Sequence, residues 1–82
     1  MRIGRAHRFH AGEWRGPHYR HWKFGERLPP AYYSRGLWIN SYGIYGLMTP
    51  PADAVWVRSD PDALLVDRYT GEVIRVVYGI FY

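Results

Sequence analysis

The sequence of 82 residues lacks cysteine, and it holds no apolar run near the length of a membrane span. The first absence excludes disulfides, thiolate metal sites and cysteine nucleophiles. The second argues against a membrane-spanning helix, which needs about 20 consecutive apolar residues. A chain of this length makes one small domain. Its apolar content of 48%, with 18% aromatic residues, exceeds that of disordered chains, so we expect at least part of it to fold.

Catalytic signatures are scarce as well. The sequence has no glycine-rich phosphate loop, and residues 25–82 contain no histidine that could activate a nucleophile. The acidic stretch SDPD at 59–62 has the composition of a turn, in which short polar side chains bond to the local backbone. We therefore expect a protein that is not an enzyme.

Positive charge is concentrated in the first 24 residues, which carry six of the eleven basic side chains and one acid, a net charge of +5. Residues 25–82 carry five basic and six acidic side chains, a net charge of −1. The first 24 residues also lack leucine and valine, although five aromatic residues are spaced along them. We interpret residues 1–24 as a weakly ordered basic arm that docks its last aromatics on a folded domain of residues 25–82.

From residue 25 onward the sequence is typical of a β-rich domain. Apolar runs at 55–58, 63–68 and 73–78 are separated by turn residues, which predicts an antiparallel meander. In the third run, Val73, Arg75 and Val77 are expected to face one way and the residues between them the other. Gly71 is expected to take the left-handed conformation in the hairpin loop before this run.

Shorter segments are expected to complete the domain. Two prolines hold residues 28–33 extended, and a short strand is predicted at 37–39. A helical turn is predicted at 41–47, with Ser41 as its N-cap and Gly46 as its terminator. The apolar last four residues are expected to pack back on the domain. The predicted fold class is α+β: a small antiparallel sheet of three to four strands with one short helix, preceded by the basic arm.

The order and spacing of several short patterns resemble the RcnB family over residues 23–82. These patterns are FGERLPPAY at 24–32, YGIYGL at 42–47, PP at 50–51, VWVR at 55–58, DALLV at 62–66, TGEVI at 70–74 and IFY at 80–82. The resemblance implies a periplasmic accessory protein of nickel/cobalt homeostasis, whose partner is an envelope protein or a metal efflux system. Members of that family normally begin with a cleaved secretory signal. No apolar segment follows the basic first residues here, so we expect that signal to have been removed.

Four histidines are the candidate metal ligands, and they form two pairs of equal spacing: His7 with His10, and His18 with His21. Imidazole nitrogen suits nickel and cobalt, and residues three apart on a helical turn share one face. Glu13, between the pairs, could add an oxygen ligand. The positive charge of the arm and its glycines argue against a preformed site, so two interpretations stay open: a weak nickel or cobalt site, or an arm without one.

Basic and aromatic side chains alternate through the arm, which suits contact with an anionic surface. Such a surface could belong to a partner protein or to a membrane, and nucleic acid is less favoured because no nucleic-acid fold signature is present. The alternative function is therefore a general envelope interaction module with no metal role. The residues predicted to make the contact are Arg5, Arg8, Trp14, Arg15, Arg20, Trp22, Tyr32 and Tyr33.

Overall fold

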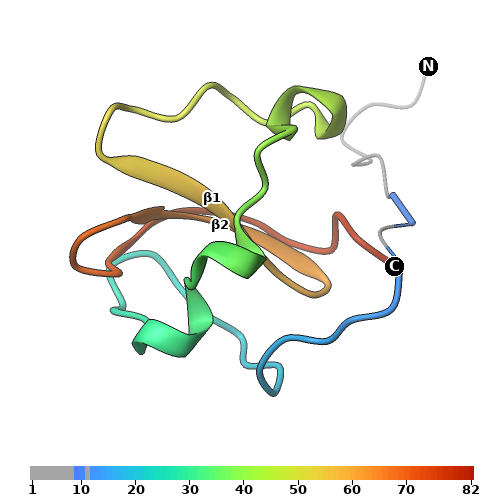
Figure 1. Ribbon diagram of the computed structural model, residues 1–82, viewed down its shortest axis with the longest axis horizontal. Helices are drawn as coiled ribbons and strands as arrows, with labels where there is room; N and C mark the ends of the chain where they lie inside the picture. Colours follow the sequence, from blue (N-terminus) through green and yellow to red (C-terminus); the bar gives the residue numbers. More distant parts are fainter. Residues whose placement is uncertain (1–8, 11) are drawn as a thin grey trace.

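The fold is a three-stranded antiparallel sheet with the strand order β1-β2-β3, seen in a computed structural model that describes residues 9, 10 and 12–82 (Figure 1). The strands are β1 (Ala54–Ser59), β2 (Asp62–Asp67) and β3 (Val73–Val77). Tight turns join them, so each strand pairs with the next one in the sequence. The predicted meander is confirmed, and each strand lies within one residue of its predicted bounds.

The hairpin between β2 and β3 is organised by a carboxylate. Asp67 Oδ1 accepts the backbone N–H groups of Tyr69 (2.8 Å) and Thr70 (3.0 Å). Gly71 follows with φ +81°, as predicted, and its N–H donates to the carbonyl of Asp67. A side chain at Gly71 would also collide with its surroundings, because a Cβ there would lie 2.8 Å from the carbonyl oxygen of Leu28.

The predicted alternation along β3 is wrong, because a bulge interrupts its pairing with β2. Leu65 pairs with Arg75 but Val66 pairs with Val73, so Ile74 is an extra residue on β3. Beyond the bulge, side chains change face. Val73 therefore packs on one face of the sheet together with Val76, whereas Val77 packs on the other.

Over residues 12–82 the helical content consists of short 3₁₀ turns: η1 (Pro30–Tyr32), η2 (Arg35–Leu37) and η3 (Tyr42–Tyr45). The predicted helical turn at 41–47 is η3, and Gly46 ends it at φ 72° as expected. Ser41 precedes η3 without a capping side-chain hydrogen bond.

Two of these turns replace predicted extended segments. Residues 28–33 are not extended throughout, because Pro30 begins η1, where a missing backbone N–H costs nothing. The predicted strand at 37–39 is also wrong. Its first residue ends η2, and a single bridge between Trp38 and Val57 remains.

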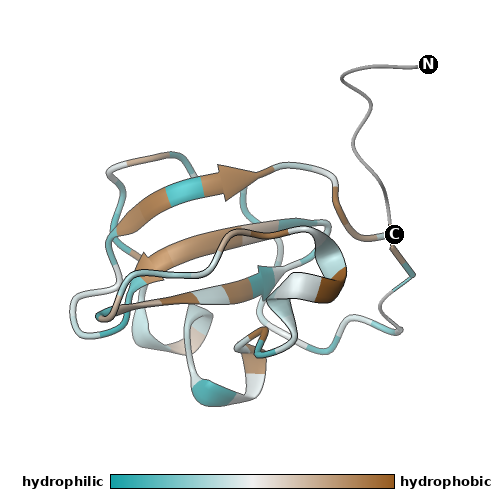
Figure 2. Cartoon of the chain, turned by 90° about the horizontal axis from the view of Figure 1, so that it is seen from above, coloured by the Kyte–Doolittle hydropathy of each residue, from teal (hydrophilic) through white to brown (hydrophobic). Residues whose placement is uncertain are grey.

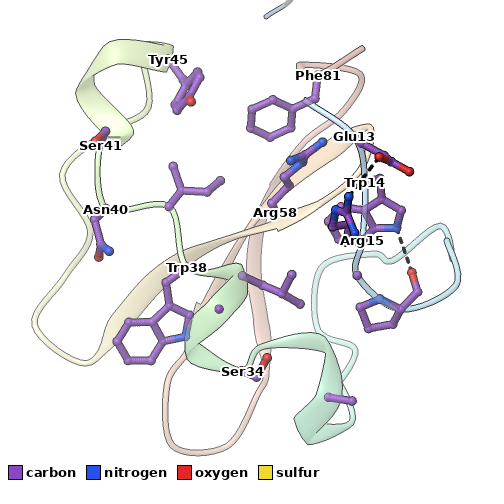
Figure 3. Close-up of a pocket in the computed structure, with 16 residues that line it drawn as sticks. Glu13, Trp14, Arg15, Ser34, Trp38, Asn40, Ser41, Tyr45, Arg58 and Phe81 are labelled. Carbon is purple, nitrogen blue, oxygen red and sulfur yellow. Dashed lines mark hydrogen bonds and ion pairs between the residues drawn. The ribbon is translucent and has the colours of Figure 1, made fainter. Parts of the chain in front are cut away.

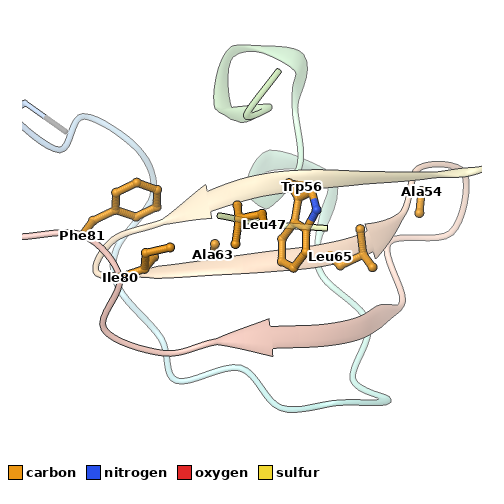
Figure 4. Close-up of a cluster of buried hydrophobic side chains, with 7 residues drawn as sticks. All are labelled: Leu47, Ala54, Trp56, Ala63, Leu65, Ile80 and Phe81. Atoms are coloured by element: carbon orange, nitrogen blue, oxygen red, sulfur yellow. The ribbon is translucent and has the colours of Figure 1, made fainter. Parts of the chain in front are cut away.

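Apolar side chains cover both faces of the sheet, and Figure 2 shows its strands as mainly hydrophobic. The first cluster of buried side chains, drawn in Figure 4, comprises Leu47, Ala54, Trp56, Ala63, Leu65, Ile80 and Phe81. The second cluster, on the other face, comprises Trp22, Leu28, Val57, Leu64, Val66 and Val73. The last residues of the chain thus pack back on the domain, as predicted.

The described part of the arm forms no named helix or strand, which agrees with the predicted lack of regular structure. It still lies against the domain. Trp22 is buried in the second cluster, whereas Phe24 is 75% exposed. Phe9 forms an isolated bridge with Phe81 and accepts the N–H of Tyr82. Among the described residues, no helix is long and apolar enough to cross a bilayer.

Candidate functional site

A groove of about 890 Å³ lies between the arm and the segment that carries η2 and η3 (Figure 3). Residues 13–17 form one wall, and Trp38, Asn40 and Tyr45 stand on the opposite side. Phe81, from the packed-back end of the chain, closes the groove near Tyr45. Its size falls within the range of ligand-binding pockets. Four separate parts of the chain therefore build one concave surface.

Arg58 of β1 lies at the base of this groove, and its side chain is only 18% exposed. Its Nε is 3.2 Å from Asp60 Oδ1, and Nη2 donates to the carbonyl of Gly12 at 2.7 Å. The guanidinium also lies over the rings of Trp14 (5.2 Å) and Phe81 (5.5 Å). Figure 3 shows Arg58 between these two rings. Arg58 thus ties the arm to the sheet and brings a positive charge into an aromatic groove.

The rim of the groove adds a second cation. Arg15 Nη2 lies 3.3 Å from Glu13 Oε1, but both side chains are strongly exposed, at 82% and 76%. Such an exposed pair is worth about 0–1 kcal/mol, so a competing carboxylate can displace it at little cost. The charged side chains that line the groove are Arg15, Arg58 and Glu13, and Asp60, which pairs with Arg58 from outside the lining, offsets their net positive charge.

The structure brings together two of the predicted contact residues, Trp14 and Arg15, at this groove. Trp22 lies elsewhere and is 4% exposed, so it offers little surface to a partner. Arg20 covers its ring at 4.5 Å. Tyr32 and Tyr33 are half-buried against the same second cluster. Arg5 and Arg8 lie outside the described residues, as does His7.

The other candidate metal ligands are exposed. The ring of His10 lies 5.5 Å from that of Tyr82, and the backbone carbonyl of His18 accepts the hydroxyl of Tyr32. His21 is held more firmly, because its ring stacks on Tyr78 with centroids 4.7 Å apart and an interplanar angle of 4°. Within the described residues, no three His, Cys, Asp or Glu side chains lie close enough together to hold a metal ion.

A hydrogen-bonded chain connects His21 to the sheet. His21 Nδ1 is 3.0 Å from the Tyr19 hydroxyl, which in turn donates to Asp62 Oδ2 at 3.3 Å. Asp62 is 2% exposed, and its Oδ1 accepts the N–H of Gly79 at 2.8 Å. Burial, with the neighbouring Asp62 carboxylate, raises the pKa of Tyr19 above its ordinary value. Sequence reasoning had assigned Asp62 only to a turn.

Sequence reasoning also missed Arg58, Trp38, Tyr45 and Phe81 as groove residues. Arg58 gave one usable signal. It follows Trp56 by two positions in a strand, which places a charged side chain on the same inward face. A charge on an inward face needs partners, so it points to a packed polar feature. The remaining residues gave no such signal, because aromatics in a small domain are ordinarily core.

The fold and the groove define a small α+β domain with a concave surface lined by aromatic and charged side chains. The model of the RcnB family, described as a nickel/cobalt transporter regulator, matches residues 25–75. The chain belongs to the RcnB family, and the resemblance noted from its sequence patterns is confirmed. Comparison with curated proteins and with solved structures gives no match.

Proposed function

We propose that this protein is a non-enzymatic accessory protein of nickel/cobalt homeostasis in the periplasm, and that it acts by docking a partner protein in the groove between the arm and η2–η3. The family description, a regulator of nickel/cobalt transport, supports the metal-homeostasis role. The observation that carries the docking role is the groove, where Trp14 and Arg15 of the arm meet Arg58 of the sheet. The arm and the domain act together at this surface.

The chemistry of the lining favours an acidic, extended segment that carries a bulky apolar side chain. Arg15 provides positive charge at the rim, where Glu13 is displaceable from its exposed pair, and the guanidinium of Arg58, paired with Asp60, lies at the base. Aromatic rings and guanidinium groups are the side chains that most often dominate binding energy at protein interfaces. The charge excess in the first 24 residues would also speed the encounter with an acidic partner.

Two glycines offer a matched test of the groove. Gly36 lines it and Gly43 does not, and a Cβ at either position meets nothing within 4 Å. A photo-crosslinking amino acid at each position, introduced in cells grown with nickel, should therefore be tolerated equally. We expect an adduct with one envelope protein from position 36 and none from position 43.

Charge variants complete the experiment. Arg15→Glu should reduce the adduct several-fold, whereas Arg75→Glu, an exposed arginine outside the groove, should leave it unchanged. The same Arg15→Glu variant should fail to restore nickel tolerance to cells that lack the protein. Adducts of equal yield from both positions, or no adduct from either, would overturn the proposed docking.

A further inference from the structure

The strongest further feature is a pair of arginines placed on the indole ring of Trp38. The guanidinium carbon of Arg35 lies 5.2 Å from the centre of this ring, and that of Arg68 lies 5.8 Å from it. Arg68 also lies over the ring of Tyr69, at 5.1 Å. A cation within about 6 Å of a ring centre is attracted to the face of the ring. The turn η2 and the β2–β3 hairpin thus bring two positive charges to one aromatic side chain.

The ring of Trp38 is held firmly in place. It packs against the second cluster, and its Nε1 donates to the carbonyl of Tyr33 at 2.9 Å. The hairpin is tied down beside it, because the backbone N–H of Arg68 donates to the carbonyl of Asp53 at 2.9 Å. Arg35 and Arg68 themselves are exposed. A fixed ring therefore presents two guanidinium groups to solvent.

Both of these arginines lack a carboxylate partner. Neither forms an ion pair with a described residue, whereas the two arginines of the groove lie beside carboxylates. The acidic residue next to Arg68 in the sequence, Asp67, uses its Oδ1 to accept the N–H groups of Tyr69 and Thr70. The positive charge at Trp38 is therefore available to an acidic ligand.

The surroundings of the two arginines favour single carboxylates over a broad anionic surface. Asp67 pairs with Ala54, next to Asp53, and its N–H donates to the carbonyl of Glu72, so three acidic residues belong to this end of the sheet. A membrane surface or a nucleic acid would bring negative charge against all three. A single carboxylate avoids that repulsion and matches the planar guanidinium group with two parallel hydrogen bonds.

We infer that the acidic segment proposed for the groove continues past Trp38 and places two carboxylates, separated by one residue, on Arg35 and Arg68. Trp38 also lines the groove, where Figure 3 shows it across from Trp14. Alternate side chains of an extended segment lie on one side, about 7 Å apart. The guanidinium carbons are no farther apart than the sum of their distances to the ring, so such a pair reaches both. The inference rests on the proposed function and adds the spacing of the partner's acidic residues to it.

The first test places a photo-crosslinking benzoylphenylalanine at Tyr69, in cells grown with nickel. Tyr69 is 68% exposed, and the new residue keeps an aromatic ring beside Arg68. Phe24 is the matched control position. It is 75% exposed and precedes Gly25, which bonds to β3 at the sheet edge opposite Trp38. We expect position 69 to capture the same envelope protein as position 36, and position 24 to capture none.

The pattern of adducts distinguishes this inference from the groove proposal. An adduct from position 36 with none from position 69, or with equal yields from positions 69 and 24, would overturn the inference and leave the groove proposal standing. The absence of an adduct from position 36 would overturn both.

Charge variants test the two arginines directly. Arg35→Glu and Arg68→Glu should each lower the yield from position 69 several-fold, whereas Arg75→Glu should leave it unchanged. Mass spectrometry of the adduct should locate a partner segment with two acidic residues separated by one position. Replacing one of these by lysine should restore the yield of the Arg68→Glu variant, which also shows that the variant is folded. A captured segment without such a pair, or a yield that Arg68→Glu does not change, would overturn the inference.

Discussion

Replacing Trp22 by alanine tests whether the arm is part of the hydrophobic core. Trp22 is 4% exposed and packs in the second cluster, with its ring edge-on to Tyr32 at 5.3 Å. A tryptophan buries about 150–250 Å², which corresponds to about 4–6 kcal/mol at about 25 cal/mol per Å². Truncations of this kind cost about 3–5 kcal/mol. That is a large fraction of the stability of a small domain.

Trp22→Phe distinguishes the effect of ring burial on stability from the effect of the buried indole N–H. Trp22 Nε1 is buried and has no hydrogen-bond partner among the described residues. An unsatisfied buried donor costs about 1–3 kcal/mol, and phenylalanine removes that cost along with part of the packing. The two effects oppose each other, so Trp22→Phe should change the free energy of unfolding by about 1 kcal/mol or less.

The assay is urea unfolding of the full chain followed by circular dichroism. Phe24→Ala is the control, because this neighbouring aromatic is 75% exposed and should change stability by about 0.5 kcal/mol or less. Deletion of residues 1–23 should destabilise the domain at least as much as Trp22→Ala. A loss below about 1 kcal/mol for Trp22→Ala, or equal losses for Trp22→Ala and Phe24→Ala, would refute the inclusion of the arm in the core.

Two further predictions concern the Asp67 carboxylate of the β2–β3 hairpin and two glycines with positive φ, Gly46 and Gly71. The backbone N–H groups of Thr70 and Tyr69 lower the pKa of Asp67 in the folded state. The Asp67 carboxylate therefore makes its full contribution to the free energy of unfolding above about pH 4, the pKa in the unfolded state. That contribution is lost as the pH falls through the lower folded pKa. The stability gap between the wild type and Asp67→Asn in urea should therefore be constant near neutral pH and narrow below pH 4; a gap that widens in acid would contradict this. Gly71→Ala should cost more than Gly46→Ala. Both glycines have positive φ, at an expected cost of about 1–2 kcal/mol, but only at Gly71 does the new Cβ meet a backbone oxygen, at 2.8 Å. Equal decreases in melting temperature for the two variants would rule out a steric cost from the contact between the new Cβ and the backbone oxygen at Gly71.

The elements that could be predicted from the sequence are those specified by neighbouring residues. The strands alternate with turn-forming residues over short spans, and Gly46 and Gly71 occupy left-handed positions that few other residues adopt. The family model matches this same region, residues 25–75. The bulge at Ile74 escaped prediction, because nothing in an apolar run of β3 distinguishes the extra residue. Pro30 likewise fits both an extended segment and the first position of a 3₁₀ turn.

The sequence by itself determined a small antiparallel meander, a basic arm with little regular structure and the RcnB resemblance. The tertiary structure decided what the arm does. Arg58 reaches Gly12 across 46 residues, Tyr78 reaches Trp22 across 56, and Tyr19 reaches Asp62 across 43. Each contact depends on how the arm crosses the finished sheet. Periodicity and turn chemistry describe local backbone preferences, so they contain no information on which distant side chains meet in the groove or orient His21.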